Sequence, residues 1–156
     1  MPNWCDNKLR VSGPIEDVVN FKRHAVGHPV IWPRPSYEKQ EDYDKRVEET
    51  QKMKVLLTFS KFVPVPEDVL KKEYSMEGYN WCVNNWGTKW DLGDEGMTVE
   101  EDGKVLIYRF TTAWSPPIPV VIAMSEQFPR LRFSIRFRED GMGFKGIESY
   151  KGGMRI

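Results

Sequence analysis

Three tryptophans and three asparagines fall within the twelve residues 80–91, and no other stretch of the chain concentrates binding-type side chains so strongly. Asn, Gly, Thr and Asp favour turns because their short side chains bond nearby backbone or tolerate positive φ. Each indole combines a large apolar surface with one N–H donor. The stretch is therefore typical of a structured loop. Three interpretations stay open: a small core beneath the loop, a ligand pocket with an apolar wall, or a surface for a partner protein.

A fourth tryptophan, in the segment TAWSPP at 112–117, is assigned to the same candidate site. The residues predicted to bind a ligand or partner are Trp81, Asn85, Trp86, Lys89, Trp90, Asp91 and Trp114. Lys89 and Asp91 flank Trp90 and form a candidate polar pair. Acid and base roles depend on geometry, so no catalytic residue is predicted.

A second candidate site is basic and belongs to predicted strands at 8–12, 53–63 and 131–138. Each strand alternates between two faces, and if Leu9 and Val11 face the helices, the opposite face holds bases and no acid. These bases are Lys8, Arg10, Lys54, Arg132, Arg136 and Arg138. Phosphate contacts dominate nucleic-acid affinity, so such a face predicts nucleic-acid binding as an alternative function.

The register of the strand at 105–114 decides what that strand adds to the basic face. It contributes either Tyr108 and Phe110, which can stack on bases, or Arg109. Two observations weigh against a nucleic-acid site. Solvated strand faces commonly carry Lys, Arg, Thr and Ser, and the acidic segment at 38–49 could lie across the face and neutralise it.

No metal site or cofactor is predicted. His24 and His28 have the four-residue spacing of a helical metal-binding pair, but Gly27 interrupts the helix between them. Cys5 and Cys82 lack an evident histidine partner for thiolate activation and are predicted to be free thiols. The sequence leans away from an enzyme, and an enzyme with a site at the tryptophan-rich stretch is the remaining alternative.

The elements that must position these residues follow one another along a single predicted domain of 156 residues. A strand at 8–12 precedes a helix at 14–25 and a polar, acidic insertion at 28–52. A strand at 53–63, a hairpin of 97–100 with 105–114, a helix at 119–128 and a strand at 131–138 come next. The glycine-rich tail, 141–156, is predicted to be irregular. The order predicts an α+β, ferredoxin-like βαββαβ sandwich with an antiparallel four-stranded sheet and both helices on one face.

Several motifs resemble the YubB ferredoxin-like family of uncharacterised plasmid and phage proteins. They are MPNWCDN at the start of the chain, FVPVPE at 62–67, NWGTKWD at 85–91 and TAWSPP at 112–117. The resemblance covers nearly the whole chain and implies the same fold and an origin in a mobile genetic element. It implies no activity, and no catalytic residue is carried over.

The overall charge gives no pull toward nucleic acid or membrane, because Lys plus Arg and Asp plus Glu number 23 each. No apolar run is long enough to span a bilayer and no signal peptide is evident, so the expected location is the cytoplasm. The sequence therefore predicts a non-catalytic binding module, monomeric or weakly dimeric, whose partner is an unidentified host or element protein.

Overall fold

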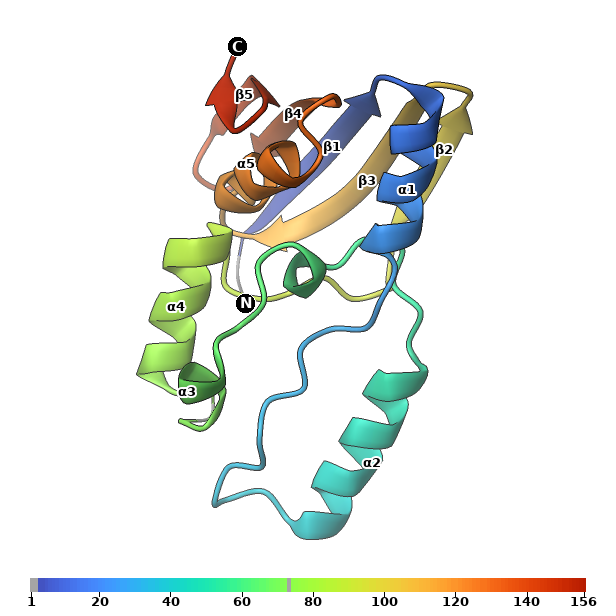
Figure 1. Ribbon diagram of the computed structural model, residues 1–156. Helices are drawn as coiled ribbons and strands as arrows, with labels where there is room; N and C mark the ends of the chain where they lie inside the picture. The colour runs from blue at the N-terminus through green and yellow to red at the C-terminus, as the bar shows by residue number, and fades with distance from the viewer. Residues whose placement is uncertain (1–2, 73) are drawn as a thin grey trace.

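The computed structural model describes residues 3–72 and 74–156 and has the predicted ferredoxin-like core. The core consists of β1 (Trp4–Ser12), α1 (Ile15–Ala25), β2 (Thr98–Asp102), β3 (Val105–Ala113), α5 (Ile118–Gln127) and β4 (Arg132–Glu139). The strands pair antiparallel in the order β2-β3-β1-β4, and α1 and α5 cover one face of the sheet (Figure 1). The strand at 8–12, both helices and the hairpin before 105–114 are confirmed.

The sheet has six strands rather than four, because the tail adds β5 (Phe144–Lys151) and β6 (Met154–Arg155) beside β4. The prediction of an irregular tail is wrong. Its glycines mark hairpin turns: Gly143 and the pair Gly152 and Gly153 have positive φ between the strands. Between these turns, Tyr150 pairs with Phe133 and is buried.

The predicted strand at 53–63 is also wrong. Only Val55 forms a bridge, to Gly27, and the chain then makes the 3₁₀ helix η1 (Phe59–Lys61). The apolar alternation nevertheless reflects burial, since Val55, Leu57 and Phe59 are shut off from solvent. The position of the second core strand is taken by β2, so the segment between α1 and that strand is 26–97, much longer than the 28–52 predicted.

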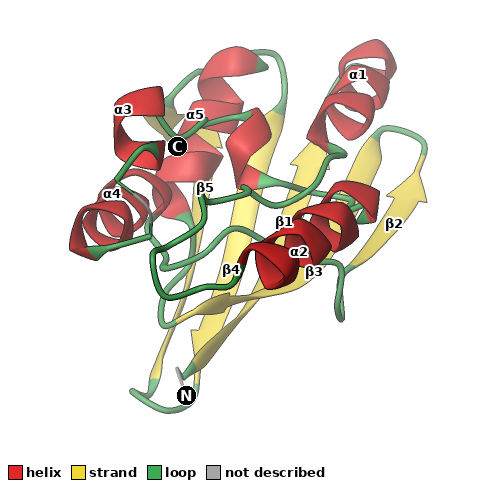
Figure 2. Cartoon of the chain, turned by 90° about the horizontal axis from the view of Figure 1, so that it is seen from below, coloured by secondary structure: helices red, strands yellow, loops and turns green. Residues whose placement is uncertain are grey.

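This long segment carries α2 (Gln40–Lys52), α3 (Glu67–Leu70) and α4 (Met76–Trp86). The acidic part of the 28–52 insertion is helical as α2, which has no buried residue, whereas Val30 and Trp32 before it pack against the core. Helix α2 lies beyond one end of the sheet (Figures 1 and 2). It therefore does not cover the face opposite α1 and α5.

Most of the predicted tryptophan-rich loop is the helix α4. Gly78, Cys82 and Trp86 recur every four residues and are the buried positions of this helix, so packing against α5 overrides the turn preference of the asparagines. Gly87 ends the helix with φ 77°, and a Cβ at this residue would lie 2.7 Å from the Pro119 ring. Glycine at position 87 thus allows both the helix end and its close approach to α5.

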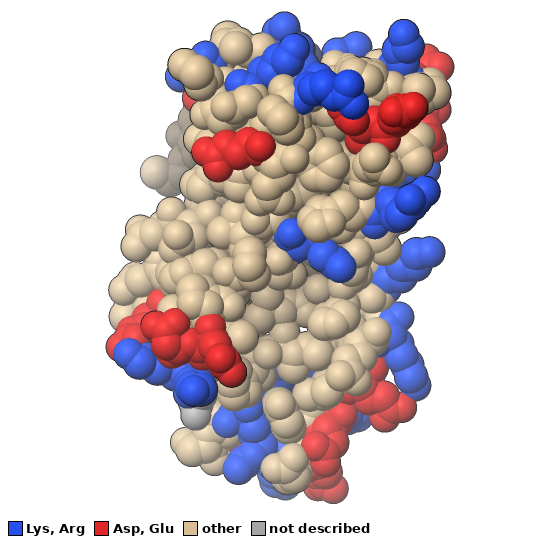
Figure 3. All heavy atoms as spheres, viewed as in Figure 1, with Lys and Arg blue, Asp and Glu red and all other residues tan. Residues whose placement is uncertain are grey.

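The main core lies between the sheet and its helices and is strongly aromatic. The Phe21 ring contacts Phe62, Phe128 and Phe133 with centroids 5.3 Å apart. Viewed from this helix-bearing side, charged groups of both signs gather at the top, at the bottom and along one edge, and the area between them carries little charge (Figure 3). Among residues 3–72 and 74–156, no helix has the length and apolar character needed to cross a membrane.

Candidate binding site on the open face of the sheet

The face of the sheet opposite α1 and α5 carries bases in adjacent rows. The strand register places Arg109 of β3 and Arg136 of β4 directly opposite Lys8 of β1, on either side of it. In the next row, Asp6 pairs with Thr111 and Arg138, and Arg138 pairs with Lys145. Like charges directly opposite one another destabilise a sheet, so this arrangement costs folding free energy unless an anion neutralises it.

The structure resolves which predicted residues share this face. Five of the six predicted bases lie on it, all exposed: Lys8, Arg10, Arg132, Arg136 and Arg138. Lys54 does not, because it precedes the bridge at Val55 and is not part of the sheet. The bases that the prediction missed are Lys145 and Lys151 of β5. The register of β3 turns Arg109 outward, whereas Tyr108 and Phe110 are buried on the helix side.

Acidic groups neutralise only part of this face. Glu100 of β2 forms an ion pair with Arg109, and Asp140 forms one with Arg138 at 2.7 Å. In the described parts of the chain, Lys8, Arg10, Arg132 and Arg136 make no ion pair. Positive charge therefore remains unpaired along β1 and β4.

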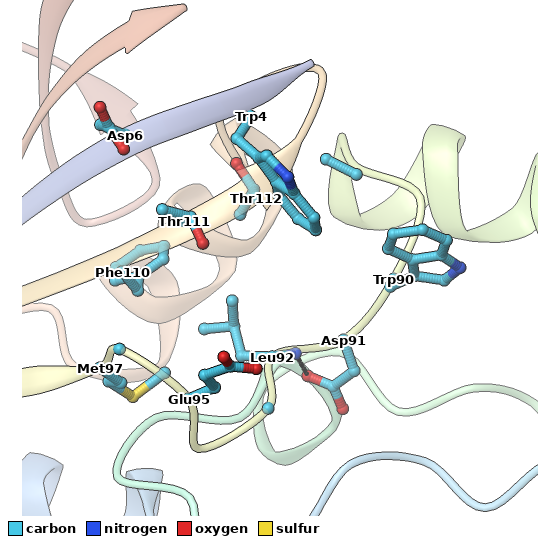
Figure 4. A pocket seen from close by; sticks show the side chains of 13 residues that line it. Trp4, Asp6, Trp90, Asp91, Leu92, Glu95, Met97, Phe110, Thr111 and Thr112 are labelled. Carbon is cyan, nitrogen blue, oxygen red and sulfur yellow. Dashed lines mark hydrogen bonds between the residues drawn. The ribbon is translucent and has the colours of Figure 1, made fainter. Parts of the chain in front are cut away.

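Two exposed tryptophans close one end of the basic face around a pocket of about 650 Å³. Trp4 continues the outward alternation of β1 beyond Lys8 and Asp6, and its ring lies 6.2 Å from that of Trp90 at an angle of 44°. The Trp4 indole points into the pocket, whose opposite wall is the segment 91–97 (Figure 4). The two indoles offer apolar faces at the surface, since Trp4 is 48% and Trp90 39% exposed.

A second pocket, of about 370 Å³, joins this tryptophan pocket to the bases. The two pockets share Asp6, Gly96, Phe110 and Thr111. The second pocket then continues along Lys8, Arg109, Arg136 and Arg138. The indoles and the bases thus line one continuous groove, although the sequence placed them in two separate candidate sites.

Several residues of the predicted tryptophan site instead serve the interior. Trp86 is fully buried, its indole N–H donates to the Val63 carbonyl at 2.8 Å, and its ring meets Trp81 edge-on at 5.4 Å. The amide of Asn85 donates to the Trp81 carbonyl at 2.9 Å. Trp86 therefore holds α4 against the segment at Val63, whereas the Asn85 hydrogen bond and the contact between the Trp81 and Trp86 rings lie within the helix.

Trp114 and the half-buried Lys89 continue the row of side chains that begins with Trp4 and Trp90. The Lys89 ammonium lies 4.5 Å from the Trp90 ring centre and 5.0 Å from that of Trp114, a cation–π geometry. Trp114 is 40% exposed and has φ 70°, a strained conformation for a residue with a side chain. Such strain clusters at functional sites.

Asp91 lies at the base of the tryptophan pocket. Its Oδ1 accepts hydrogen bonds from the Phe59 and Leu92 N–H groups, both at 2.8 Å. Oδ2 is shut off from solvent and has no partner of normal hydrogen-bond geometry among the described residues. Burial raises the pKa of Asp91, although these N–H groups, the Ser60 hydroxyl and the Val30 N–H favour the ionised form.

We expect the Asp91 carboxyl to make stability depend on pH. Its contribution is fully present below its unfolded pKa of about 3.9 and is lost as the pH rises through the raised folded pKa. Asn at position 91 keeps an acceptor for both N–H groups but does not titrate. Urea unfolding between about pH 4 and pH 8 should show the unfolding free energy of the wild type falling more steeply than that of Asp91→Asn. Parallel pH profiles would contradict this assignment.

The two cysteines are free and buried. Burial raises the pKa of Cys5 to about 11 and that of Cys82 to about 12. Both are therefore thiols at neutral pH, and neither is a nucleophile at the groove.

The sequence could have indicated Trp4. It lies two residues before Asp6 and four before Lys8, so the alternation that predicted the basic face also places Trp4 on it. The predicted strand began only at Lys8, and this tryptophan was missed. No comparable signal indicates the segment 91–97, whose position depends on the return of the chain from α4 to β2.

A βαββαβ core with an antiparallel sheet and both core helices on one face is a ferredoxin-like domain. Residues 85–156 match the family model described as the ferredoxin-like domain in Api92-like protein. The whole chain is similar to the crystal structure of a protein Api92 from Yersinia pseudotuberculosis. That similarity has a TM-score of 0.74 at 10% sequence identity and covers 100% of this chain and 96% of that one. No curated protein matches the chain.

Proposed function

We propose that the protein is a binding module for single-stranded nucleic acid, which it holds in the groove on the open face of its sheet. The observation that carries the proposal is the row Arg109, Lys8 and Arg136, which continues through the shared groove to Trp4 and Trp90. A positively charged groove with adjoining aromatic platforms is the general architecture of single-strand binding sites.

The shape of the groove favours a single strand over a duplex. In a duplex the bases are stacked within the helix, so the exposed indoles could meet only the backbone or base edges. In a single strand each nucleobase has a free face that can stack on Trp4 or Trp90, while the phosphates of the strand reach Lys8 and Arg136. The tryptophan pocket is also large enough to enclose a base.

The partner-protein interpretation of the sequence concerns the same surface, since Lys89, Trp90 and Trp114 adjoin the groove. The basic side chains on β1, β4 and β5 favour an anionic ligand over a protein of unspecified charge. A symmetric dimer through this face would bury basic side chains of the two copies against one another, and we therefore propose a monomer. The motifs shared with YubB proteins support a mobile-element origin as part of this proposal.

Fluorescence anisotropy with labelled oligonucleotides tests the proposed function. We expect single-stranded dT20 to bind more tightly than a duplex of the same length. If about five phosphates are neutralised, affinity should fall about 100-fold between about 50 and 200 mM salt. Absence of binding at the lower salt concentration, or binding that ignores salt, would overturn the proposal.

Trp4 and Trp90 should each contribute to binding by stacking. Replacing an aromatic platform with alanine costs about 1–3 kcal/mol per base, so Trp4→Ala and Trp90→Ala are each expected to weaken dT20 binding at least fivefold. Trp4→Phe, which keeps an aromatic face, is the matched control and should retain most of the affinity. Equal losses in Trp4→Ala and Trp4→Phe would argue against stacking.

A further inference from the structure

We infer that the tryptophan pocket selects guanine among the bases of a bound strand. The inference rests on the proposed function, because it assigns the pocket to a base whose neighbouring phosphates lie on the basic part of the groove. The pocket differs from the rest of the groove in charge, and that difference points to a base rich in N–H donors.

Among the described residues that line the pocket, three are acidic and none is basic. Asp91 and Glu95 line this pocket alone, and Asp6 lies at its border with the adjoining pocket, whose other charged residues are Lys8, Arg109, Arg136 and Arg138. The sign of the charge therefore reverses within the length of one groove. A ligand that fits both parts has an anionic portion next to a flat portion that donates hydrogen bonds, as a nucleotide does.

The carboxylates are available for a ligand. Asp6 and Glu95 are exposed and take part in no ion pair among the described residues. The Glu95 side chain points into the space that Trp4 and Thr111 also face (Figure 4). Independently, Asp91 lines the same pocket, and its Oδ2 is shut off from solvent without a partner of normal hydrogen-bond geometry among the described residues.

An ionised carboxylate only accepts hydrogen bonds. The four nucleobases therefore differ in how well the donors on their Watson–Crick edges match it. Guanine presents two adjacent donors, N1–H and N2–H₂, and so matches both oxygens of one carboxylate. Adenine and cytosine each present one amino group on this edge, beside a ring acceptor. Thymine presents one N–H between two carbonyl oxygens, which a carboxylate repels. A base held between the indoles with its Watson–Crick edge toward Asp6 or Glu95 is therefore bound best when it is guanine.

The test compares dT10 with three decamers in which one central thymine is replaced by dG, dA or dC. We expect the wild type to bind the dG decamer about five to a hundred times more tightly than dT10, the discrimination of one bidentate contact. In the double variant Asp6→Asn with Glu95→Gln, the preference for dG should disappear. Asp94→Asn, at an exposed neighbour that does not line the pocket, should retain it.

The outcomes separate this inference from the proposed function. Equal, salt-sensitive binding of all four decamers by the wild type would overturn guanine selection and leave single-strand binding intact. Failure to bind any decamer would overturn both. If arginine amide alone quenched the fluorescence of the wild type but not of the double variant, and no base preference appeared, the pocket would belong to a basic side chain of a protein partner.

Discussion

Replacing Trp86 by alanine is expected to lower the free energy of unfolding by about 3–5 kcal/mol, the cost of removing a large buried aromatic side chain. Trp86 is fully buried among Phe59 and Trp81. Its loss also leaves the Val63 carbonyl without its donor. Domains of this size are commonly stable by only about 5–15 kcal/mol, so the change should be evident in urea unfolding followed by circular dichroism.

Trp90→Ala is the control for this prediction. Trp90 is 39% exposed and packs against Trp4 and Lys89 at the surface. We expect its loss to cost clearly less than the loss of Trp86, because over a third of its side chain is already in water, while binding of single strands weakens. If Trp86→Ala proved as mild as Trp90→Ala, the division of the tryptophans into interior and surface groups would be wrong.

The triple variant Lys8→Ala, Arg109→Ala and Arg136→Ala is expected to lose most single-strand binding. Each basic side chain that contacts a phosphate contributes about 0.7 to the slope of log affinity against log salt concentration for single-strand binding. Removing three should lower this slope by about 2 and the affinity at low salt at least tenfold. Folding should suffer little, because the variant removes adjacent like charges from the sheet and the exposed ion pair of Arg109 with Glu100 that it also removes is worth about 1 kcal/mol or less.

A second triple variant, Lys39→Ala, Lys45→Ala and Lys54→Ala, supplies the matched control. All three lysines are exposed and lie off the sheet, before, within and after α2. This variant has the same change in net charge, so it separates the groove from the overall charge of the molecule. Equal losses of affinity in the two triple variants would show that binding depends on net charge alone.

The fold could be predicted from the sequence wherever periodicity and burial agreed. Val18, Phe21 and Ala25 have helical spacing and face the core, and the alternation of β1 and β4 gave the correct faces, whereas the register of β3 stayed open until the structure turned Arg109 outward. The strand at 53–63 failed because its alternation reflects an irregular segment that inserts its apolar residues into the core. The tail failed because its glycines lie at hairpin turns that connect two further strands.

The candidate site could be predicted only in parts. The basic face followed from strand alternation, and the importance of tryptophans followed from composition. Composition could not separate Trp86, which is buried by helical spacing, from Trp90, which lies beyond the glycine that ends the helix. The two candidate sites share one groove because the segment 91–97 returns to the edge of the sheet beside Trp4. This path depends on tertiary structure, so local sequence patterns could not predict it.

The most direct test of the proposed groove is an NMR titration of the ¹⁵N-labelled protein with dT10 at low salt. The six tryptophans give six indole N–H signals that report on separate parts of the molecule. We expect the signals of Trp4 and Trp90 to shift together with amides of β1 and β4, while the buried Trp86 signal stays in place. Shifts confined to α2 or to the helix-bearing face, or no shifts at all, would contradict single-strand binding in the groove.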